Sequence, residues 1–520
     1  MISNCTKVIL LSALAINTAS AQPAYYGTKT PYQPQQAISS YEAAPRGYQP
    51  VYTQMLARHG SRGLTGMKVD LALYNLWKLA EKEQALTPLG AKLGPDIQRI
   101  MQANALLGYG VAGISKPGYG NETQLGIAEH TQLAQRLRQR LPMLFQSLDC
   151  ATPDKAPRQI IVVTSGKDRA VDSGYFFTQS LIAQQACLAS SVTYPASLAP
   201  RAELDHRSRP AGTDRFLLYF HKLSQKQDQV SDPADPLFPT FQASQSYQAY
   251  LDSDDLRQVE ATILAQPRLA AAAQRVLKRL FKPAFIAGLN QNRFRATNEG
   301  TVTYTSADGK FVSTLTGDGN EVIASALDAA LALYDLYAAS ADMPDEAHTN
   351  FSQYMPTGQA AVFASVQDAL SFYSKGPGFA EANGVTWRMA QTLLDDFFDE
   401  AKLIAAGNYA HAAKLRFAHA ETIIPLASLL GVPGMATPQP KNLAYDYSNN
   451  LWRGEQVAPM AANIQWDLYK NDAGKILVRM LYNEKETGFK PSCDKARVAK
   501  GSYFYDYQLL ADCYQQSIAK

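Results

Sequence analysis

The sequence predicts an α/β protein with a mixed sheet flanked by helices and a mostly helical insert. Five short apolar runs are typical of strands, and they lie near the two ends of the chain: 51–57, 159–164, 414–418, 463–468 and 476–482. A tight turn at 165–168 and a helical pattern to about Cys187 follow the second run, which is an α/β unit. We therefore assign 22–190 and 405–520 to one α/β domain.

The middle of the chain has a different character. Between residues 191 and 404, helical patterns alternate with loops rich in Pro, Ser, Asp and Gln. A hairpin is expected around Asp308-Gly309, between two short strand-like runs. We expect this segment to form a mostly α-helical insert.

Two helical patterns follow the first strand, at about 87–107 and 123–148. The second pattern carries Arg136, Arg138 and Arg140, which we interpret as a solvated face. A stripe that binds nucleic acid is the alternative reading of these three arginines.

Composition excludes several classes of protein. The chain has 520 residues, of which 46% are hydrophobic and 18% charged, enough for a large core. This excludes a small disulfide scaffold and a disordered chain. Lys plus Arg number 49 and Asp plus Glu 46, a net charge of +3, which argues against a nucleic-acid partner. A compact anion can still bind where a few cations converge.

The first 21 residues are expected to be a signal peptide. Lys7 precedes an apolar run, Val8 to Ile16, and Ala19-Ser20-Ala21 is typical of a cleavage site before Gln22. This run is too short to span a membrane, and no later stretch of about 18 apolar residues occurs. We expect a secreted or periplasmic protein without a membrane span.

Four cysteines remain beyond the expected signal peptide, an even number that suits an oxidising compartment. Three pairings are possible, and we favour Cys150–Cys187 with Cys493–Cys513 because each pair is local. Four buried thiols are the alternative. The spacings do not resemble a zinc site.

The motif Arg58-His59-Gly60-Ser61-Arg62 places a histidine between two arginines, where a strand enters a loop. A neutral imidazole is a nucleophile near neutral pH. Guanidiniums bind phosphate through forked hydrogen bonds and stabilise the charge that develops during phosphoryl transfer. We expect His59 to attack phosphorus while Arg58 and Arg62 bind the phosphate. A solvated surface loop is the alternative.

Two further segments strengthen this expectation. Arg169 lies at a strand-to-helix turn, where the positive end of the helix dipole also favours an anion. His419 and Glu421 lie at a second such turn, where His419 would bind phosphate and Glu421 would protonate the departing alkoxide. An ordinary helix start with an acidic first turn is the alternative.

These residues resemble a known family. Arg58-His59-Gly60-Ser61-Arg62 is similar to the signature of branch-two histidine acid phosphatases, and His419-Ala420-Glu421-Thr422 resembles the proton-donor motif of the multiple inositol polyphosphate phosphatases. Classical phytases and acid phosphatases carry His-Asp at that place. Segments 27–32, 164–169 and 481–485 resemble the same group, in the expected order. The sequence departs from the pattern at Leu64, where a proline is usual.

The resemblance implies the histidine phosphatase fold, in which the helical insert at 191–404 covers the active site. It also implies hydrolysis of inositol hexakisphosphate (phytate) or lower inositol phosphates. It implies a phosphohistidine intermediate on His59, with no cofactor and no metal. Water would hydrolyse the intermediate with Glu421 as base. Lys68 and Lys167 are candidate contacts for the outer phosphates of the substrate, or else merely exposed lysines.

Three other functions stay open at this level. A broad acid phosphatase or sugar phosphatase would use the same fold. An exported polyanion-binding protein would keep the pocket without turnover. A metal-dependent hydrolase would need a ligand set that the spacing of His411, His419 and Glu421 does not resemble.

Overall fold

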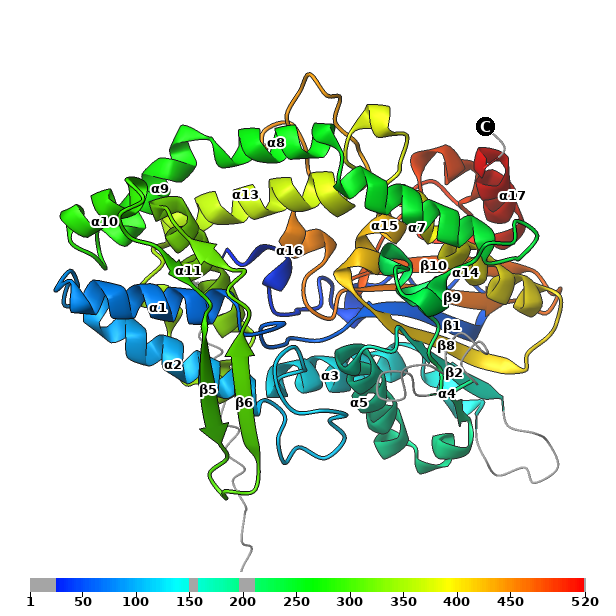
Figure 1. Ribbon diagram of the computed structural model, residues 1–520. Coiled ribbons are helices and arrows are strands. Elements are labelled where there is room, and N and C mark those ends of the chain that lie inside the picture. The colour runs from blue at the N-terminus through cyan, green and yellow to red at the C-terminus, as the bar shows by residue number, and fades with distance from the viewer. Residues whose placement is uncertain (1–24, 149–157, 196–210, 519–520) are drawn as a thin grey trace, which may run out of the picture.

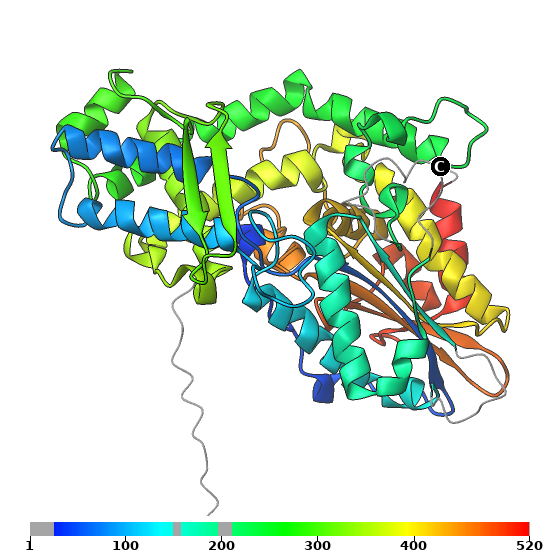
Figure 2. The same cartoon turned by 60° about the horizontal axis from the view of Figure 1, so that its bottom comes forward.

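A computed structural model describes residues 25–148, 158–195 and 211–518. The expected signal peptide and Cys150 lie outside these described residues. The molecule has two parts, a sheet with helices on both faces and a mostly helical part beside it (Figure 1). Figure 2 shows the same two parts from another side, with a long hairpin crossing the helical part.

The sheet contains eight strands among the described residues. Seven lie in one order: β11 (Lys485–Glu486), β10 (Ile476–Tyr482), β9 (Asn463–Lys470), β1 (Gln49–Arg58), β8 (His411–Ala418), β2 (Gln159–Thr164) and β3 (Val192–Thr193). The eighth, β12 (Phe504–Asp506), pairs with β10. Strands β1, β8, β2 and β3 are parallel neighbours, whereas β9 and β10 run antiparallel. The predicted mixed α/β fold is therefore confirmed.

Helices cover both faces of the sheet. Successive side chains along a strand point to opposite faces, so they belong to two different cores. Met55 and Ala57 of β1 belong to one core, and Leu56 between them belongs to the other. The first face is covered by α3 (Gln124–Arg140), α4 (Pro142–Gln146) and α5 (Asp168–Gln184), and the second by α14 (Gln391–Ala405), α15 (Ala420–Leu430) and α17 (Tyr507–Ile518) (Figure 1).

The helical part draws on distant segments of the chain. Its helices include α1 (Val69–Lys82), α2 (Gly90–Leu106), α8 (Asp254–Leu264), α9 (Pro267–Leu277), α10 (Pro283–Asn290), α11 (Ala326–Ala341) and α13 (Thr357–Lys375). Helix α7 (Phe238–Leu251) connects it to the sheet side (Figure 1). The predicted hairpin is present as β5 (Gly300–Thr305) and β6 (Val312–Gly317), and it lies across α2.

The remaining elements are short. They are α6 (Arg215–Leu218), α12 (Pro344–Ala347), α16 (Gly454–Val457) and a two-stranded pair, β4 (Ala296–Thr297) with β7 (Val322–Ile323). Helices α1 and α2 precede residue 191 yet pack with the helical part, α1 directly against α11. The domain boundaries at 190 and 405 stay a prediction.

Two features that the sequence predicts, a single helix and a solvated face, differ in the structure. The helix expected over 123–148 breaks at Leu141, because Pro142 has no backbone N–H and its ring disfavours helix in the residue before it. The expected solvated face is also wrong for two of its arginines. Arg140 is buried in an ion pair with Asp467 (3.0 Å), and Arg136 pairs with buried Glu484 (2.8 Å).

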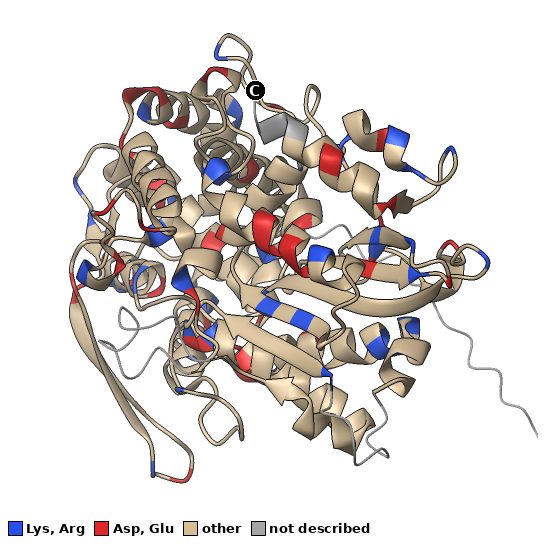
Figure 3. Ribbon diagram, turned by 90° about the vertical axis from the view of Figure 1, so that its right-hand side faces the viewer, with Lys and Arg blue, Asp and Glu red and all other residues tan. Residues whose placement is uncertain are grey.

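A disulfide joins Cys493 to Cys513, which is the local pairing that we favoured. The pairing of Cys187 with Cys150 stays a prediction. Within the described ranges, no helix is both long and apolar enough to cross a membrane. Basic and acidic residues are intermingled over the side of the molecule in Figure 3.

Candidate active site

The candidate site lies where three neighbouring parallel strands end. Arg58 at the end of β1 pairs with Ala418 at the end of β8, and Thr164 at the end of β2 pairs with Phe417. Because parallel strands end at the same edge of a sheet, the residues that follow them are brought together. His59, Ser165 and His419 are those residues.

His59 is buried, with 3% of its surface exposed, and one ring nitrogen is already engaged. Nδ1 lies 3.0 Å from the carbonyl oxygen of Gly60. A carbonyl can only accept, so Nδ1 carries the proton and Nε2 presents a lone pair. Burial, followed by Arg169 and Arg58, holds the pKa of His59 well below its usual range. The imidazole is therefore neutral and suited to nucleophilic attack through Nε2.

Buried carboxyl groups hold the loop that carries His59. Glu122 accepts a hydrogen bond from the Gly60 N–H (2.9 Å), and Glu129 accepts from the N–H of Ser61 (2.7 Å). Helix α3 packs so closely that a Cβ on Gly60 would lie 2.6 Å from the carbonyl oxygen of Gly126. Glycine is required at position 60 for this close approach.

Three arginines converge on the site. Arg58 donates from Nη1 to the carbonyl oxygens of Ala458 (2.6 Å) and Thr28, and Arg62 donates to Gly63 (2.6 Å). Burial, together with Arg169 and Arg58, lowers the pKa of Arg62 to about 9. The Nε–H groups of Arg58, Arg62 and Arg169 are buried and have no hydrogen-bond partner in the part of the chain that the structure describes. Such unpaired charged donors are typical of an anion site.

Arg169 and His419 are in contact at the starts of two helices. Arg169 lies in the first turn of α5, and His419 is the N-cap of α15. Nη2 of Arg169 donates to Nδ1 of His419 (3.3 Å), since a guanidinium cannot accept. Nε2 of His419 then donates to Oγ of Ser165 (2.8 Å). The ring of His419 lies edge to face with that of His59, 5.4 Å between centroids.

Glu421 lies in the first turn of α15 and forms an ion pair. Its Oε1 is 2.8 Å from Nζ of Lys375, the last residue of α13. Burial raises the pKa of Glu421, but Lys375 and then His221 outweigh it and hold this pKa well below the usual range. Glu421 is therefore ionised in this structure.

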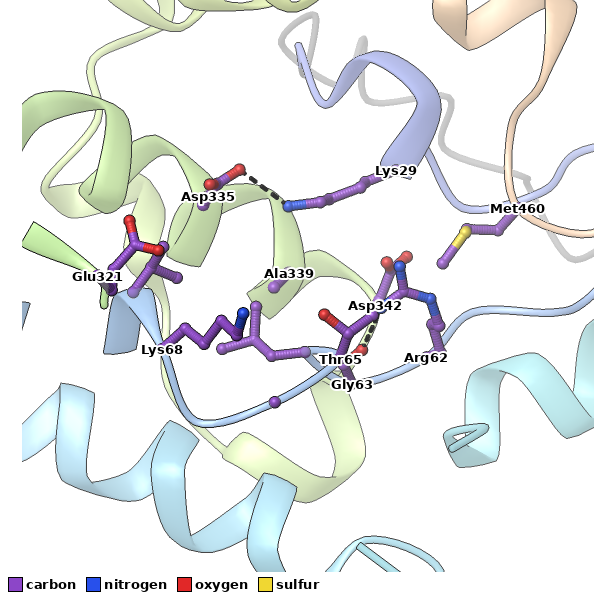
Figure 4. Close-up of a pocket in the computed structure, with 13 residues that line it drawn as sticks. Lys29, Arg62, Gly63, Thr65, Lys68, Glu321, Asp335, Ala339, Asp342 and Met460 are labelled. Carbon is purple, nitrogen blue, oxygen red and sulfur yellow. Dashed lines mark hydrogen bonds and ion pairs between the residues drawn. The ribbon is translucent and has the colours of Figure 1, made fainter. Parts of the chain in front are cut away.

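The two candidate lysines occupy different places. Exposed Lys68 lines a pocket of about 180 Å³ together with Arg62 and Lys29 (Figure 4). Lys29 reaches this pocket from the N-terminal segment and pairs with Asp335 (3.0 Å). Lys167 lies away from that pocket, with Nζ 5.2 Å from the ring centroid of Tyr219.

The structure adds site residues that no sequence motif indicated. The ring of His221 lies 5.9 Å from that of His419, and Tyr219 lies 5.3 Å from the same ring. Asp342, at the end of α11, accepts a hydrogen bond from Oγ of Ser61 (3.1 Å). These residues and Lys375 come from the middle of the chain and carry no local signal. Among the described residues, no group of three or more His, Cys, Asp or Glu is arranged to hold a metal ion.

Comparison with known families decides what kind of site this is. Residues 51–483 match the histidine phosphatase superfamily (branch 2). The chain belongs to this family. The predicted family and the prediction of a phosphatase are therefore confirmed.

Solved structures of similar proteins agree with the assignment of this chain to the histidine phosphatases. The multiple inositol polyphosphate phosphatase of Bifidobacterium longum, in complex with inositol hexasulfate, is 33% identical with a TM-score of 0.80, over 95% of this chain and 97% of that one. The same protein in complex with phosphate is 32% identical with a TM-score of 0.82, over 95% and 98% of the two chains. The phytase from D. castellii shares the fold, at 12% identity and a TM-score of 0.56 over 95% and 85%. No curated protein sequence matches this chain.

Proposed function

We propose that this histidine phosphatase hydrolyses phosphomonoesters of inositol polyphosphates, phytate and its lower derivatives, through a phosphohistidine intermediate on His59. Three guanidiniums surround a neutral imidazole, and their buried Nε–H groups have no hydrogen-bond partner among the described residues; this observation carries the proposal. Similarity over nearly the whole length to an inositol polyphosphate phosphatase that binds inositol hexasulfate supports the substrate class.

The first step transfers the phosphoryl group to the protein. Nε2 of His59 attacks phosphorus, the P–N bond forms and the ester P–O bond breaks. Arg58, Arg62 and Arg169 neutralise the charge on the phosphoryl oxygens. His419 also contacts the phosphate in this proposal. For this contact the proton of His419 is on Nδ1, and Nε2 accepts a hydrogen bond from the Ser165 hydroxyl, which can donate as well as accept. Glu421 gives a proton to the departing oxygen.

The second step restores His59. Water attacks phosphorus, Glu421 accepts a proton from that water, and the P–N bond breaks to release inorganic phosphate. Lys68 and Lys167 contact phosphates that do not react. The chain is exported in this proposal, and its disulfide suits an oxidising compartment.

Substrate class is tested by comparing the turnover of phytate and of a sugar monophosphate by the purified protein. We expect the higher kcat/KM on phytate. A higher value on the monophosphate indicates a sugar or acid phosphatase instead. Binding of phytate without release of phosphate indicates a non-catalytic polyanion-binding protein.

The intermediate is tested by acid-free quenching of the reaction with ³²P-labelled substrate. We expect label on the wild-type chain that is stable to base and lost in acid, and none on the His59→Ala variant. That variant should keep the fold, since its side chain faces the site, and circular dichroism checks this. Turnover by a folded His59→Ala protein at the wild-type rate would exclude the mechanism.

A further inference from the structure

The pairing of Glu421 with Lys375 joins the two parts of the molecule. Glu421 begins the helix that follows β8, whereas Lys375 ends α13 of the helical part. The Glu421 side chain is 33% exposed and the Lys375 side chain 23% exposed, so the pair is not fully buried. A pair of this kind is weaker than a buried one and can exchange partners.

Several other groups face Glu421 from neighbouring elements. His221 comes from the short 3-10 helix Phe220–Lys222, His419 from the end of β8, and Tyr247 from α7. The arginines at 58, 62 and 169 and Tyr219 also interact with the Glu421 carboxylate electrostatically. Lys375 is the strongest of the groups that lower the pKa of Glu421, and it alone forms an ion pair with it among the described residues.

This arrangement conflicts with the chemistry that Glu421 must perform. A general acid must carry a proton before the ester bond breaks. In contact with an ammonium group, the carboxylate holds no proton. The ion pair must therefore loosen when the proper substrate binds.

We propose that Lys375 is a latch on Glu421, which a second phosphate of a polyphosphorylated substrate releases by drawing the ammonium group away. This inference rests on the proposed function. Lys375 is a positioning residue for the acid and, once released, a contact for a phosphate that does not react.

Charge makes the exchange favourable. A phosphate monoester carries a charge of about −1.5 to −2 near neutral pH, against −1 for the carboxylate, and offers three oxygens to an ammonium group. After the exchange, Glu421 has lost its closest cation and faces phosphate charge. Both changes raise its pKa.

The proton balance is simple. Glu421 takes a proton from solvent after Lys375 has moved. It passes that proton to the ester oxygen as the P–O bond breaks and the P–N bond to His59 forms. A substrate with a single phosphate has no second phosphate to move Lys375. Glu421 then stays ionised and cannot protonate the departing alkoxide, so this substrate is hydrolysed slowly.

The test is the Lys375→Met variant, assayed over a range of pH on phytate and on glycerol phosphate, an alkyl monophosphate. On glycerol phosphate, we expect the alkaline limb of the kcat profile to move to higher pH by one unit or more, and kcat on that limb to rise about tenfold. On phytate, we expect KM to rise about tenfold while the alkaline limb of kcat stays in place.

Two variants serve as controls. Lys375→Arg keeps the charge beside Glu421, so the alkaline limb on glycerol phosphate should stay at its wild-type pH. Lys402→Met removes a charge from an exposed position on α14 and should change neither profile. Circular dichroism and thermal unfolding show whether each variant is folded.

An unchanged alkaline limb on glycerol phosphate in a folded Lys375→Met protein would overturn the latch. An equal fall in kcat on both substrates would do so as well, because a merely structural role predicts that result. Failure of the proposed function looks different, since wild type would then prefer the monophosphate or His59→Ala would stay active.

Discussion

At the scale of single residues, the site is organised by which atoms are already engaged. The carbonyl oxygen of Gly60 accepts a hydrogen bond from Nδ1–H of His59, so the lone pair of the ring is on Nε2. Backbone carbonyls accept a hydrogen bond from one nitrogen of Arg58 and one of Arg62, while the Nε–H of each has no partner in the described part of the chain. The protein thus fixes these side chains before any substrate binds, so little reorganisation is needed during reaction.

Glu421→Gln separates the acid role from phosphate binding. The amide cannot give up a proton, so phytate, whose alkoxide is a poor leaving group, should be hydrolysed about 10² to 10⁴ times more slowly. Activated aryl phosphates need little protonation and should be affected far less. Steady-state kinetics on p-nitrophenyl phosphate and phytate measure the difference. An equal loss on both would exclude the acid role.

Arg169→Ala removes one cation from the reacting phosphate. We expect a loss of transition-state stabilisation of about 3 kcal/mol, or a fall of 10² to 10³ in kcat/KM. In the wild-type protein, Nη2 of Arg169 donates a hydrogen bond to Nδ1 of His419, so the substitution also removes this donor from His419. The kcat/KM for phytate is the measurement, and a fall of less than tenfold would place Arg169 outside the reacting phosphate.

At the scale of elements, the parallel order β1–β8–β2 does most to assemble the site. Each strand is followed by a residue of the site, and two of these strands lead directly into helices whose N-termini favour an anion. The antiparallel side of the sheet also contacts the loop that carries His59, because the N–H of Ala461, just before β9, donates to the carbonyl oxygen of His59 (3.0 Å). Asn483, just after β10, accepts a hydrogen bond from the N–H of Asn463 (3.0 Å).

Helix α3 covers β8 and carries a buried histidine whose protonation should govern acid stability. His130 is fully buried against Phe417, with ring centroids 5.6 Å apart, and burial lowers its pKa to about 3. In the unfolded chain its pKa is about 6.5, so the unfolded state takes up a proton first as pH falls. The contribution of His130 to the free energy of unfolding is therefore fully present above pH 6.5 and is lost as the pH falls from 6.5 to 3.

The His130→Leu variant checks this linkage. Between pH 7 and pH 4, wild type should lose about 3 kcal/mol of unfolding free energy through His130 alone. The variant should lack this contribution, so its unfolding free energy should fall less steeply. Urea unfolding at a series of pH values measures both slopes. Equal slopes would mean that His130 does not stay neutral in the folded protein.

At the scale of the whole molecule, the site lies where the two parts meet. Asp342 ends α11 of the helical part and accepts a hydrogen bond from Ser61, in the loop that carries His59. Lys375 ends α13 and reaches Glu421. Motion between the parts would therefore alter the nucleophile's loop and the acid together.

The charge of the pocket comes from side chains of the protein, which leads to a prediction about metals. In the proposed mechanism three guanidiniums neutralise the phosphate, so EDTA should leave hydrolysis of an aryl phosphate unchanged. Vanadate, which resembles the phosphoryl group in transfer, should inhibit. Initial rates with each additive are the measurement. Loss of activity with EDTA, and its recovery with a divalent cation, would indicate a metal-dependent hydrolase.

Sequence patterns predicted elements whose signals are local. Strands β2 and β10 have the expected bounds, because buried strands are continuous apolar runs between turns. Helices α1 and α13 were not predicted. Arg136 and Arg140 were assigned to solvent, although Glu484 and Asp467, more than 300 residues away, bury and pair them. A partner that distant leaves no mark on the local pattern.

The α/β class, the family and the candidate catalytic residues were predictable from sequence, because they follow from apolar runs and from short motifs at strand ends. Only the tertiary structure decided which groups surround those residues. His221, Asp342 and Lys375 reach the site from the middle of the chain, and none has a neighbouring motif that marks it. Folding brings their charges within range of Glu421 and Ser61, and electrostatic effects depend on distance in space, whatever the separation along the chain.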